Sequence, residues 1–559
     1  MPEGSRPPQD YPAALLLPGD AFDTEQLQVL GRRVAGRSLA RGITAALSPD
    51  EELTILVSSA EERERLRHLL KPQLPPGARL RLVVGFQPEA LVRAGALHVP
   101  DPGLARWELL RSGRPANAFS LTGVIHTLCS SSVFDSLDRL LTAPLQPWDA
   151  LVCTSSAGRD VVQAALDHHK AALERRFGGP LPRPAGPQLP LIPLAVEDPL
   201  PASAQSRQQR RQAARARLGL PEGAFVVLFL GRLSFHSKAH PLPLYRALAR
   251  LIAERPQAQV RLLECGHLYN GAVAEAYADL QQAFPQLPLT RVGGLQPASE
   301  AEKVLALEAA NVFISPADNL QETFGLSVIE AMAAGLPTLV SDWDGYKDLV
   351  AHGVTGLRIP IHVAEASLDQ LDPLDRTYRL GLMDYDTMVG VRSLAAVLDE
   401  EAMVQALRLL VDDPARCEAM GAAARQRWQS LYCWPVVALQ YRNLWQELAA
   451  LRRHAGPLAA EPSATAPMAR LFAHYGTGAF QASRLVCHPG ASSPDLLNRP
   501  MQQLFSQLIC GAAQQGLIEH LKRHGGVDQA ALTALGIPVA SHQAVLALLV
   551  KLGIAKRQS

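Results

Sequence analysis

Short apolar runs alternate with longer amphipathic stretches through most of this chain. In the first third, the runs are Leu53–Val57, Arg81–Val84, Leu121–Ile125 and Ala150–Thr154. The pattern restarts after residue 220, with runs at Phe225–Leu230, Val260–Leu263, Leu289–Val292, Val312–Ser315 and Thr338–Ser341. Continuous apolar strands separated by helix-length segments are typical of parallel sheets covered on both faces. The two series therefore predict an α/β protein with two Rossmann-like, doubly wound units.

Proline-rich stretches divide the chain. The first lies between Gly178 and Pro201, and we interpret it as a stiff, extended linker, because proline at this density breaks regular elements. The composition of residues 455–467, rich in Pro, Ala and Ser, predicts a second linker. The predicted segments are residues 1–200, 201–431, 432–454 and 465–559.

A basic run, Arg207–Arg217, follows the first linker. A patch for nucleic acid is one interpretation. We favour a single solvated helix that opens the second unit, because Leu218–Pro221 would end it and a strand follows.

The last segment is predicted to be a mainly helical extension of unknown role. Val527–Pro538 and Ala540–Gly553 have the pattern of two amphipathic helices separated by a short break. The pair resembles half of a helix-turn-helix or winged-helix module. Its modest positive charge does not favour DNA, so packing or docking of a protein partner is the preferred interpretation.

Composition narrows the function classes. Lys and Arg number 54 against 53 Asp and Glu, so nothing global indicates nucleic acid. No apolar run reaches the roughly 18 residues that span a bilayer, and the N-terminus lacks the apolar core of a secretory signal. Seven dispersed cysteines without a CxxC pair indicate reduced thiols. We therefore expect a cytoplasmic protein; peripheral contact with the inner face of the membrane stays open.

The most specific chemistry lies at Glu322–Glu330, where two glutamates flank a Phe-Gly-Leu turn that opens a helix. The start of a helix presents unpaired N–H groups and the positive end of its dipole, and so attracts anions. Two carboxylates beside such a phosphate site suit a sugar nucleotide, because they can accept hydrogen bonds from its hydroxyl groups.

The whole run Ser315–Pro337 resembles the Glu-x7-Glu signature of the retaining glycosyltransferases of GT-B fold, family 4, also called glycosyl transferase group 1. The resemblance covers roughly residues 10–450. It implies two Rossmann-like domains facing a cleft: residues 1–200 for the acceptor and 201–431 for the nucleotide sugar. It also implies that the helix at 432–454 crosses back to the first domain.

The segment Gly231–Lys238 resembles the family's Gly-Arg-Leu…Lys element. The resemblance assigns Arg232 and Lys238 to the diphosphate leaving group, whose charge two fixed cations can neutralise. Ala239 stands where the family often has Gly. Surface charge is the alternative for an isolated Arg and Lys.

The resemblance also distributes the donor among the other residues. Glu322 would contact sugar hydroxyls and Glu330 the ribose, while the N–H groups of Phe324, Gly325 and Leu326 would meet the sugar and diphosphate. The base would lie near Gly266 and Gly293. Asp344–Tyr346 reads as another loop that faces the site, with no defined role.

Two candidates lie in the first domain. His126 ends a predicted strand where the family often has a histidine facing the donor sugar; a structural hydrogen bond is the alternative. Gly36, within Gly31–Gly42, is the candidate for the family's glycine loop beside the diphosphate. A plain basic helix is the alternative there.

No metal site is predicted, because His236, His240 and His267 lack ligand spacing and no Asp-x-Asp motif stands out. The expected protein is thus a metal-independent hexosyltransferase without a cofactor beyond its nucleotide-sugar donor. Its acceptor is a hydroxyl of a glycan, lipid or small molecule. The alternatives are a GT-B phosphorylase or epimerase, and a non-catalytic binding or regulatory protein.

Overall fold

The computed structural model describes residues 11–19, 31–182, 186–202, 205–364, 372–460, 465–499, 509 and 511–558. It contains two compact units, Met1–Ala464 and Thr465–Ser559. The first unit holds two lobes, each built on a six-stranded parallel sheet. The N-terminal segment discussed above, Met1–Asp10, lies outside the described residues.

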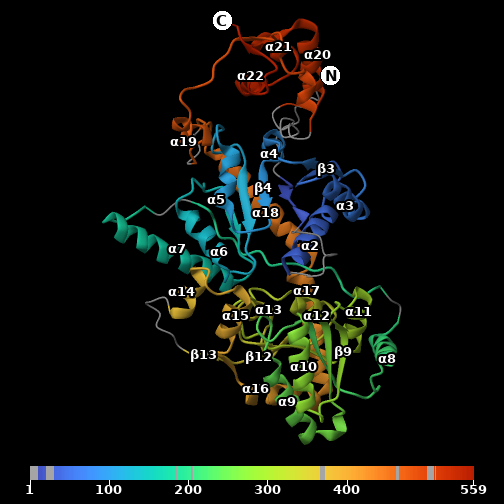
Figure 1. Ribbon diagram of the computed structural model, residues 1–559. Helices are drawn as coiled ribbons and strands as arrows, with labels where there is room; N and C mark the ends of the chain where they lie inside the picture. Colours follow the sequence, from blue (N-terminus) through green and yellow to red (C-terminus); the bar gives the residue numbers. More distant parts are fainter. Residues whose placement is uncertain are drawn as a thin grey trace. The chain divides into compact units, whose positions relative to one another are not determined.

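The first lobe has strand order β3-β2-β1-β4-β5-β6. Its apolar strands are covered by helices, as Figure 1 shows in blue and cyan. Two strands of this lobe, β1 and β4, are not among the apolar runs named above. The run of β4 is interrupted by His98, whose ring is buried and bonds to Thr122 Oγ1 at 3.0 Å. The elements are β1 Ala14–Leu16, α2 Gly31–Ala45, β2 Glu52–Val57, α3 Ala60–Leu70, β3 Arg79–Val84, α4 Pro88–Ala94, β4 Ala96–Val99, α5 Leu104–Trp107, β5 Ser120–Val124, α6 Ser131–Asp138, β6 Ala150–Val152 and α7 Ser156–Phe177.

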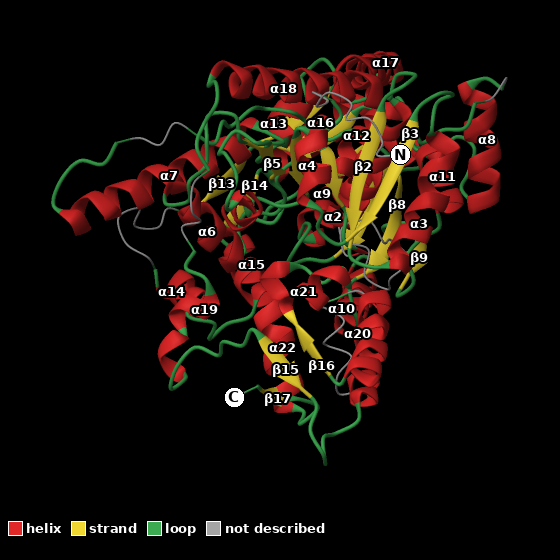
Figure 2. Cartoon of the chain, turned by 90° about the horizontal axis from the view of Figure 1, so that it is seen from above, coloured by secondary structure: helices red, strands yellow, loops and turns green. Residues whose placement is uncertain are grey.

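The second lobe repeats this order, β12-β11-β10-β7-β8-β9. Figure 2, seen from above, shows strands of both lobes in yellow with red helices around them. The predicted fold class is therefore confirmed. The elements are α8 Arg207–Leu218, β7 Val226–Leu233, α9 Pro241–Glu254, β8 Arg261–Leu268, α10 Gly271–Ala283, β9 Leu289–Gly294, α11 Glu300–Ala309, β10 Val312–Ser315, α12 Leu326–Ala333, β11 Thr338–Ser341, α13 Tyr346–Leu349, β12 Gly356–Ile359, β13 Ile361–Val363, α14 Pro373–Arg379, α15 Tyr385–Ser393, β14 Ala396–Leu398, α16 Glu400–Asp412 and α17 Pro414–Leu431.

The proline-rich stretch after α7 is extended and lies along the edge of the first sheet. Leu151 donates to the Gln188 carbonyl at 2.8 Å, and Ile192 donates to the Cys153 carbonyl at 3.0 Å. Prolines are compatible with such an edge position because they need no partner for an N–H group. This segment thus joins the lobes while packing against the first one.

Helix α18, Trp434–His454, packs on the first lobe although it follows the second in sequence (Figure 1). Its aromatic residues belong to the first lobe's core, where Trp445 is fully buried. Gly42 of α2 makes room for it: a Cβ there would lie 1.9 Å from the Trp434 ring.

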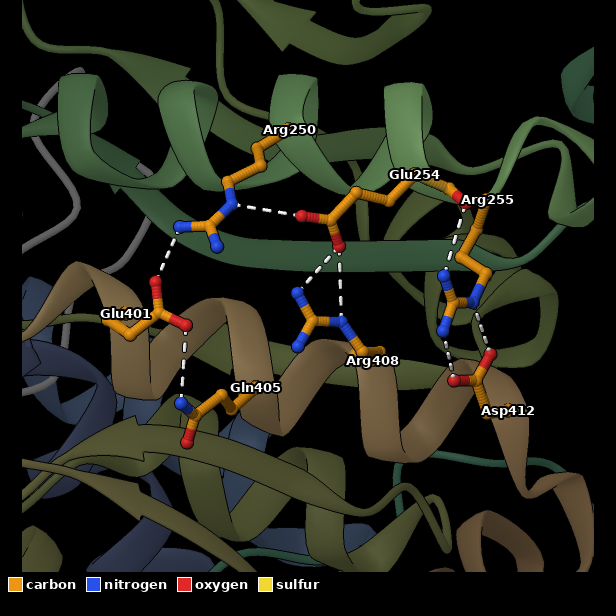
Figure 3. A network of polar contacts seen from close by, with 7 residues as sticks. All are labelled: Arg250, Glu254, Arg255, Glu401, Gln405, Arg408 and Asp412. Atoms are coloured by element: carbon orange, nitrogen blue, oxygen red, sulfur yellow. Dashed lines mark hydrogen bonds and ion pairs between the residues drawn. The ribbon is translucent and has the colours of Figure 1, made fainter.

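Ion pairs join α9 to α16 on the surface of the second lobe (Figure 3). Arg408 donates to Glu254 at 2.6 Å, and Arg255 Nε donates to Asp412 at 2.8 Å. Beneath them, apolar residues of both helices are buried in one core cluster.

The second unit has its own apolar core and a three-stranded antiparallel sheet, β16-β15-β17. The interpretation of Val527–Pro538 as one helix is wrong at its start, because Val527 lies in β16 opposite Leu485. That pairing spans about forty residues of sequence, which local periodicity cannot report. The elements are α19 Met468–Leu471, β15 Arg484–Val486, α20 Gly511–His524, β16 Gly526–Asp528, α21 Gln529–Ala534, α22 His542–Lys551 and β17 Lys556–Arg557.

Candidate functional site

The predicted donor residues meet at the carboxyl edge of the second sheet. The first strand of this lobe, β7, lies between β8 and β10, so the chain reverses its direction across the sheet at β7 and β10. Doubly wound sheets bind ligands at such a switch point. Lys238 follows β7, Glu322 follows β10 and Tyr346 follows β11.

Lys238 and Glu322, both partly buried, form a polar cluster with the buried Tyr346. Lys238 Nζ lies 2.5 Å from Glu322 Oε2, and the Tyr346 hydroxyl lies 3.3 Å from the same oxygen. Ser315 Oγ holds that hydroxyl at 2.8 Å. Burial acts to raise the pKa of Glu322, but Lys238 outweighs it and the pKa is lowered; the pKa of Lys238 is raised in turn by Glu322 against the effect of burial. Both groups are therefore charged at neutral pH.

Asp344 adds a strained residue to this cluster. Its φ of 36° is in the left-handed region, and its Oδ1 accepts the Tyr346 N–H at 3.1 Å. Its Oδ2 is buried and has no hydrogen-bond partner among the described residues. Burial, and then the nearby charge of Glu322, raise the pKa of Asp344 well above its usual value. Strain and an unsatisfied polar atom at one position are features that accumulate at functional sites.

The start of α12 lies beside the cluster. Gly325 caps the helix with φ 109°, and a Cβ there would come within 2.4 Å of the Tyr346 ring. Only glycine fits this position. Phe324 is buried in the core, Leu326 begins the helix, and the first N–H groups of the helix lack intrahelical acceptors. The predicted anion-binding element is therefore built as a glycine-capped helix start.

Glu330, one helical turn further on, has a different cation. Lys303 Nζ of α11 lies 2.6 Å from Glu330 Oε1. Burial acts to lower the pKa of Lys303, and Glu330 overcomes this and raises it. Sequence reasoning missed Lys303, because nothing local distinguishes it from a surface lysine of an amphipathic helix.

Arg232 lies against an aromatic ring. Its guanidinium is 5.6 Å from the Tyr269 ring centroid, and its charge helps to lower the pKa of His267, where burial is the larger cause. Beside it, Gly231, Gly266 and Gly293 stand in register across β7, β8 and β9, all with positive φ. A Cβ at Gly266 would lie 1.8 Å from the Gly231 carbonyl oxygen. This row of glycines leaves bare backbone at the sheet edge, where the nucleotide base is expected.

In the first lobe, Gly36 and His126 line the same small cavity, of about 20 Å³. The glycine-loop interpretation of Gly31–Gly42 is wrong, because these residues are helical in α2 and Gly36 is buried in its second turn. Ala35, Leu39 and Ile43 of this helix are buried, and their spacing of four residues places them on one face. The helix alternative is the one observed.

Contacts between the lobes lie next to the donor residues. Ser155 Oγ donates to the Thr323 carbonyl at 2.7 Å, and Ser156 donates from N and Oγ to Asp348, each at 2.6 Å. A second bridge runs from Cys129 to the Tyr385 hydroxyl, which also donates to Gln321 at 3.2 Å. The loop that carries Glu322 is thus held from both lobes.

The described residues contain no group of three or more His, Cys, Asp or Glu that could hold a metal ion. Among them, no helix combines the length and apolar character that crossing a membrane requires.

Known proteins show what this chain is similar to. Residues 210–374 match the family model described as glycosyl transferases group 1. Relatives named D-inositol 3-phosphate glycosyltransferase include those of Kineococcus radiotolerans, 34% identical over 271 residues (47% of this chain, 52% of the relative), and Thermobispora bispora, 34% identical over 204 residues (35% and 46%). The chain spans about half the length of the curated relatives it matches.

Among solved structures, a glycosyltransferase from Rickettsia africae superposes with a TM-score of 0.51, covering 78% of this chain and 99% of that one at 11% identity. At this identity the likeness shows the fold, which is that of GT-B proteins. The match at residues 210–374 adds that the second lobe is similar in sequence to glycosyl transferases group 1.

Proposed function

We propose that this protein is a retaining glycosyltransferase that moves a sugar from a nucleotide-diphosphate donor to an acceptor hydroxyl. The observation that carries the proposal is the partly buried Lys238–Glu322 pair at the switch point of the second sheet, beside a glycine-capped helix start. A cation and a helix N-terminus attract the diphosphate, while a fixed carboxylate accepts sugar hydroxyls.

Each donor group has a complementary residue. Lys238 contacts Glu322 directly. A bound donor would therefore place its phosphate at the ammonium group while its sugar hydroxyls donate to the carboxylate. Glu330, held by Lys303, offers its second oxygen to the ribose. Arg232 and the glycine row would receive the rest of the nucleotide, and His126 would approach the donor from the first lobe.

The chemistry we propose needs no metal. Negative charge grows on the diphosphate as the glycosidic bond breaks, and fixed cations and helix N–H groups stabilise it without reorganisation. The acceptor oxygen would bond to the anomeric carbon on the face from which the diphosphate leaves, which yields retention, and its proton would pass to the leaving diphosphate oxygen. Activity is therefore expected to persist in excess EDTA.

The acceptor follows from the relatives only as a first candidate. Their name makes D-inositol 3-phosphate the first acceptor to test. The same test should include lipid-linked acceptors, which would require peripheral membrane contact. It should also include a protein partner bound by Thr465–Ser559.

The decisive experiment measures hydrolysis and transfer with UDP-, GDP-, ADP- and TDP-sugars, with and without acceptor. Lys238→Met, Glu322→Gln and Glu330→Gln are the test variants, and Lys71→Ala, an exposed lysine of the first lobe, is the control. One donor should be turned over, and NMR of the product should show that the anomeric configuration is retained. The test variants should lose this turnover. Turnover by none of the donors, or equal turnover by all variants, would reject the proposal.

A further inference from the structure

A cavity of about 260 Å³ lies at the opposite edge of the second sheet from the donor residues. Phe225, Asn311 and Pro337 line it, and each immediately precedes a strand, β7, β10 or β11. The donor residues follow the other ends of these strands. Since a strand advances about 3.3 Å per residue, the length of the sheet separates the two places.

Three arginines of α8 line this cavity. Arg207, Arg211 and Arg215 are spaced by four residues, so they lie on one face of the helix. Arg215 has a structural role: it donates to the Ala309 carbonyl at 3.0 Å and to Asn311 Oδ1 at 2.6 Å. It fixes α8 against the loops that precede the strands.

The other two guanidinium groups lack such partners. Arg207 makes no hydrogen bond or ion pair with any described residue, and its Nη1 is 3.4 Å from where a Cβ on Gly335 would lie, so it rests against bare backbone. Burial and the neighbouring charge of Arg211 lower the pKa of Arg207 to about 10. Arg211 Nε is buried without an acceptor within the described structure.

The only carboxylate lining the described cavity is Glu418, and it is a weak partner. Its Oε1 lies 3.9 Å from Arg211 Nη1, and its side chain is 72% exposed. Three cations therefore face one solvated anion across a concave space. Closely spaced, partly buried like charges disfavour one another, and a bound anion would reverse that effect.

We propose that this cavity binds a small phosphorylated metabolite, with its phosphate held by Arg207 and Arg211. Guanidinium groups match phosphate oxygens with paired donors, which ammonium groups do not. The volume equals that of roughly eight water molecules, enough for a phosphate group with a small organic part. The site is distinct from the donor site and does not depend on the proposed transfer reaction.

The test uses the full-length protein and calorimetric titration with inorganic phosphate and with pyrophosphate. The double variant Arg207→Gln, Arg211→Gln removes the proposed contacts. Arg217→Gln removes an exposed arginine of the same helix outside the cavity. Lys238→Met, in the donor site, distinguishes phosphate binding at the donor site from phosphate binding in the arginine cavity.

The double variant should bind pyrophosphate at least tenfold more weakly, while the Arg217 and Lys238 variants keep this binding event. Wild-type protein that binds neither probe, or a folded double variant that binds as tightly as wild type, would overturn the proposal. If the double variant does not fold, hydrogen exchange of wild-type protein decides: pyrophosphate should protect α8 and residues 414–418. Protection confined to residues 322–330 would also overturn it.

Discussion

The Arg111–Asp149 pair of the first lobe and the Lys238–Glu322 pair of the second lobe differ in what surrounds them. In the first lobe, Asp149 accepts two hydrogen bonds from Arg111, of 3.0 and 2.7 Å. It also accepts hydrogen bonds from the backbone N–H groups of Leu121 and Gln146. In the second lobe, Glu322 takes Lys238 through one oxygen, and a neighbouring Asp344 oxygen has no partner within the described chain.

The difference indicates two roles for buried charge. A carboxylate whose acceptor positions are all occupied, joining β5 to the β6 region, stabilises the fold and has nothing to offer a ligand. The Lys238–Glu322 pair lies beside a strained residue with an unsatisfied oxygen, so its network is incomplete and a ligand can complete it. The following predictions test this contrast.

The largest effect is expected for Asp149→Ala. The change leaves Arg111 buried without its partner and also deprives two buried N–H groups of their acceptor. The free energy of unfolding should fall by about 3–5 kcal/mol, measured by urea denaturation. Asp135→Ala, on the surface of α6, is the control. A loss no larger than that of the control would break the comparison.

The double variant Lys238→Met, Glu322→Gln should show the reverse pattern. Removing both members of a buried pair is often neutral for stability, so the melting temperature should stay within a few degrees. Sugar turnover should fall by about 10²–10³-fold, because a preorganised charge is lost. Parallel calorimetry and donor-hydrolysis assays measure the two quantities, and a variant that unfolds while retaining specific activity would contradict this prediction.

Asp318→Asn, in the loop before Glu322, should change how stability depends on pH. Burial raises the pKa of Asp318 to about 7, although His240 N–H donates to it at 3.1 Å. The folded protein therefore retains a proton that the unfolded chain releases near pH 4, and stability falls as the pH rises from about 4 to 7. The variant removes this dependence.

Relative to wild type, Asp318→Asn should be close to neutral at pH 4.5 and more stable by about 2 kcal/mol at pH 8.5, at 1.36 kcal/mol per pKa unit with partial relaxation. Denaturation at both pH values measures it. A stability difference that does not change with pH would show that Asp318 titrates normally.

The smallest effect is expected for Arg408→Gln in the surface network of Figure 3. The variant removes the contact with Glu254, whose pKa is lowered mainly by its hydrogen bond to Arg408. Exposed pairs contribute little, so the melting temperature should change by less than about 2 °C. A larger drop would mean that the network, and not the apolar core beneath it, holds α16 in place.

Much of the architecture was predictable because its signals are local. Apolar runs such as Val312–Ser315 are strands at the predicted residues, since a buried parallel strand needs apolar side chains on both faces. The Phe-Gly-Leu turn at Glu322–Glu330 became a glycine-capped helix start for the same local reason. The assignment of the donor residues to their roles stays a prediction.

Other features were decided only in three dimensions. Lys303 became the partner of Glu330, the Tyr346 hydroxyl joined Lys238 and Glu322, and Arg207 and Arg211 came to face a cavity. The sequence alone determined most of the strands and helices of the two lobes and the position of the Phe-Gly-Leu turn, because backbone preference and hydrophobic period act over a few residues. Strand order, charge pairing and the shape of cavities depend on contacts between residues tens to hundreds of positions apart, and only the tertiary structure decided them.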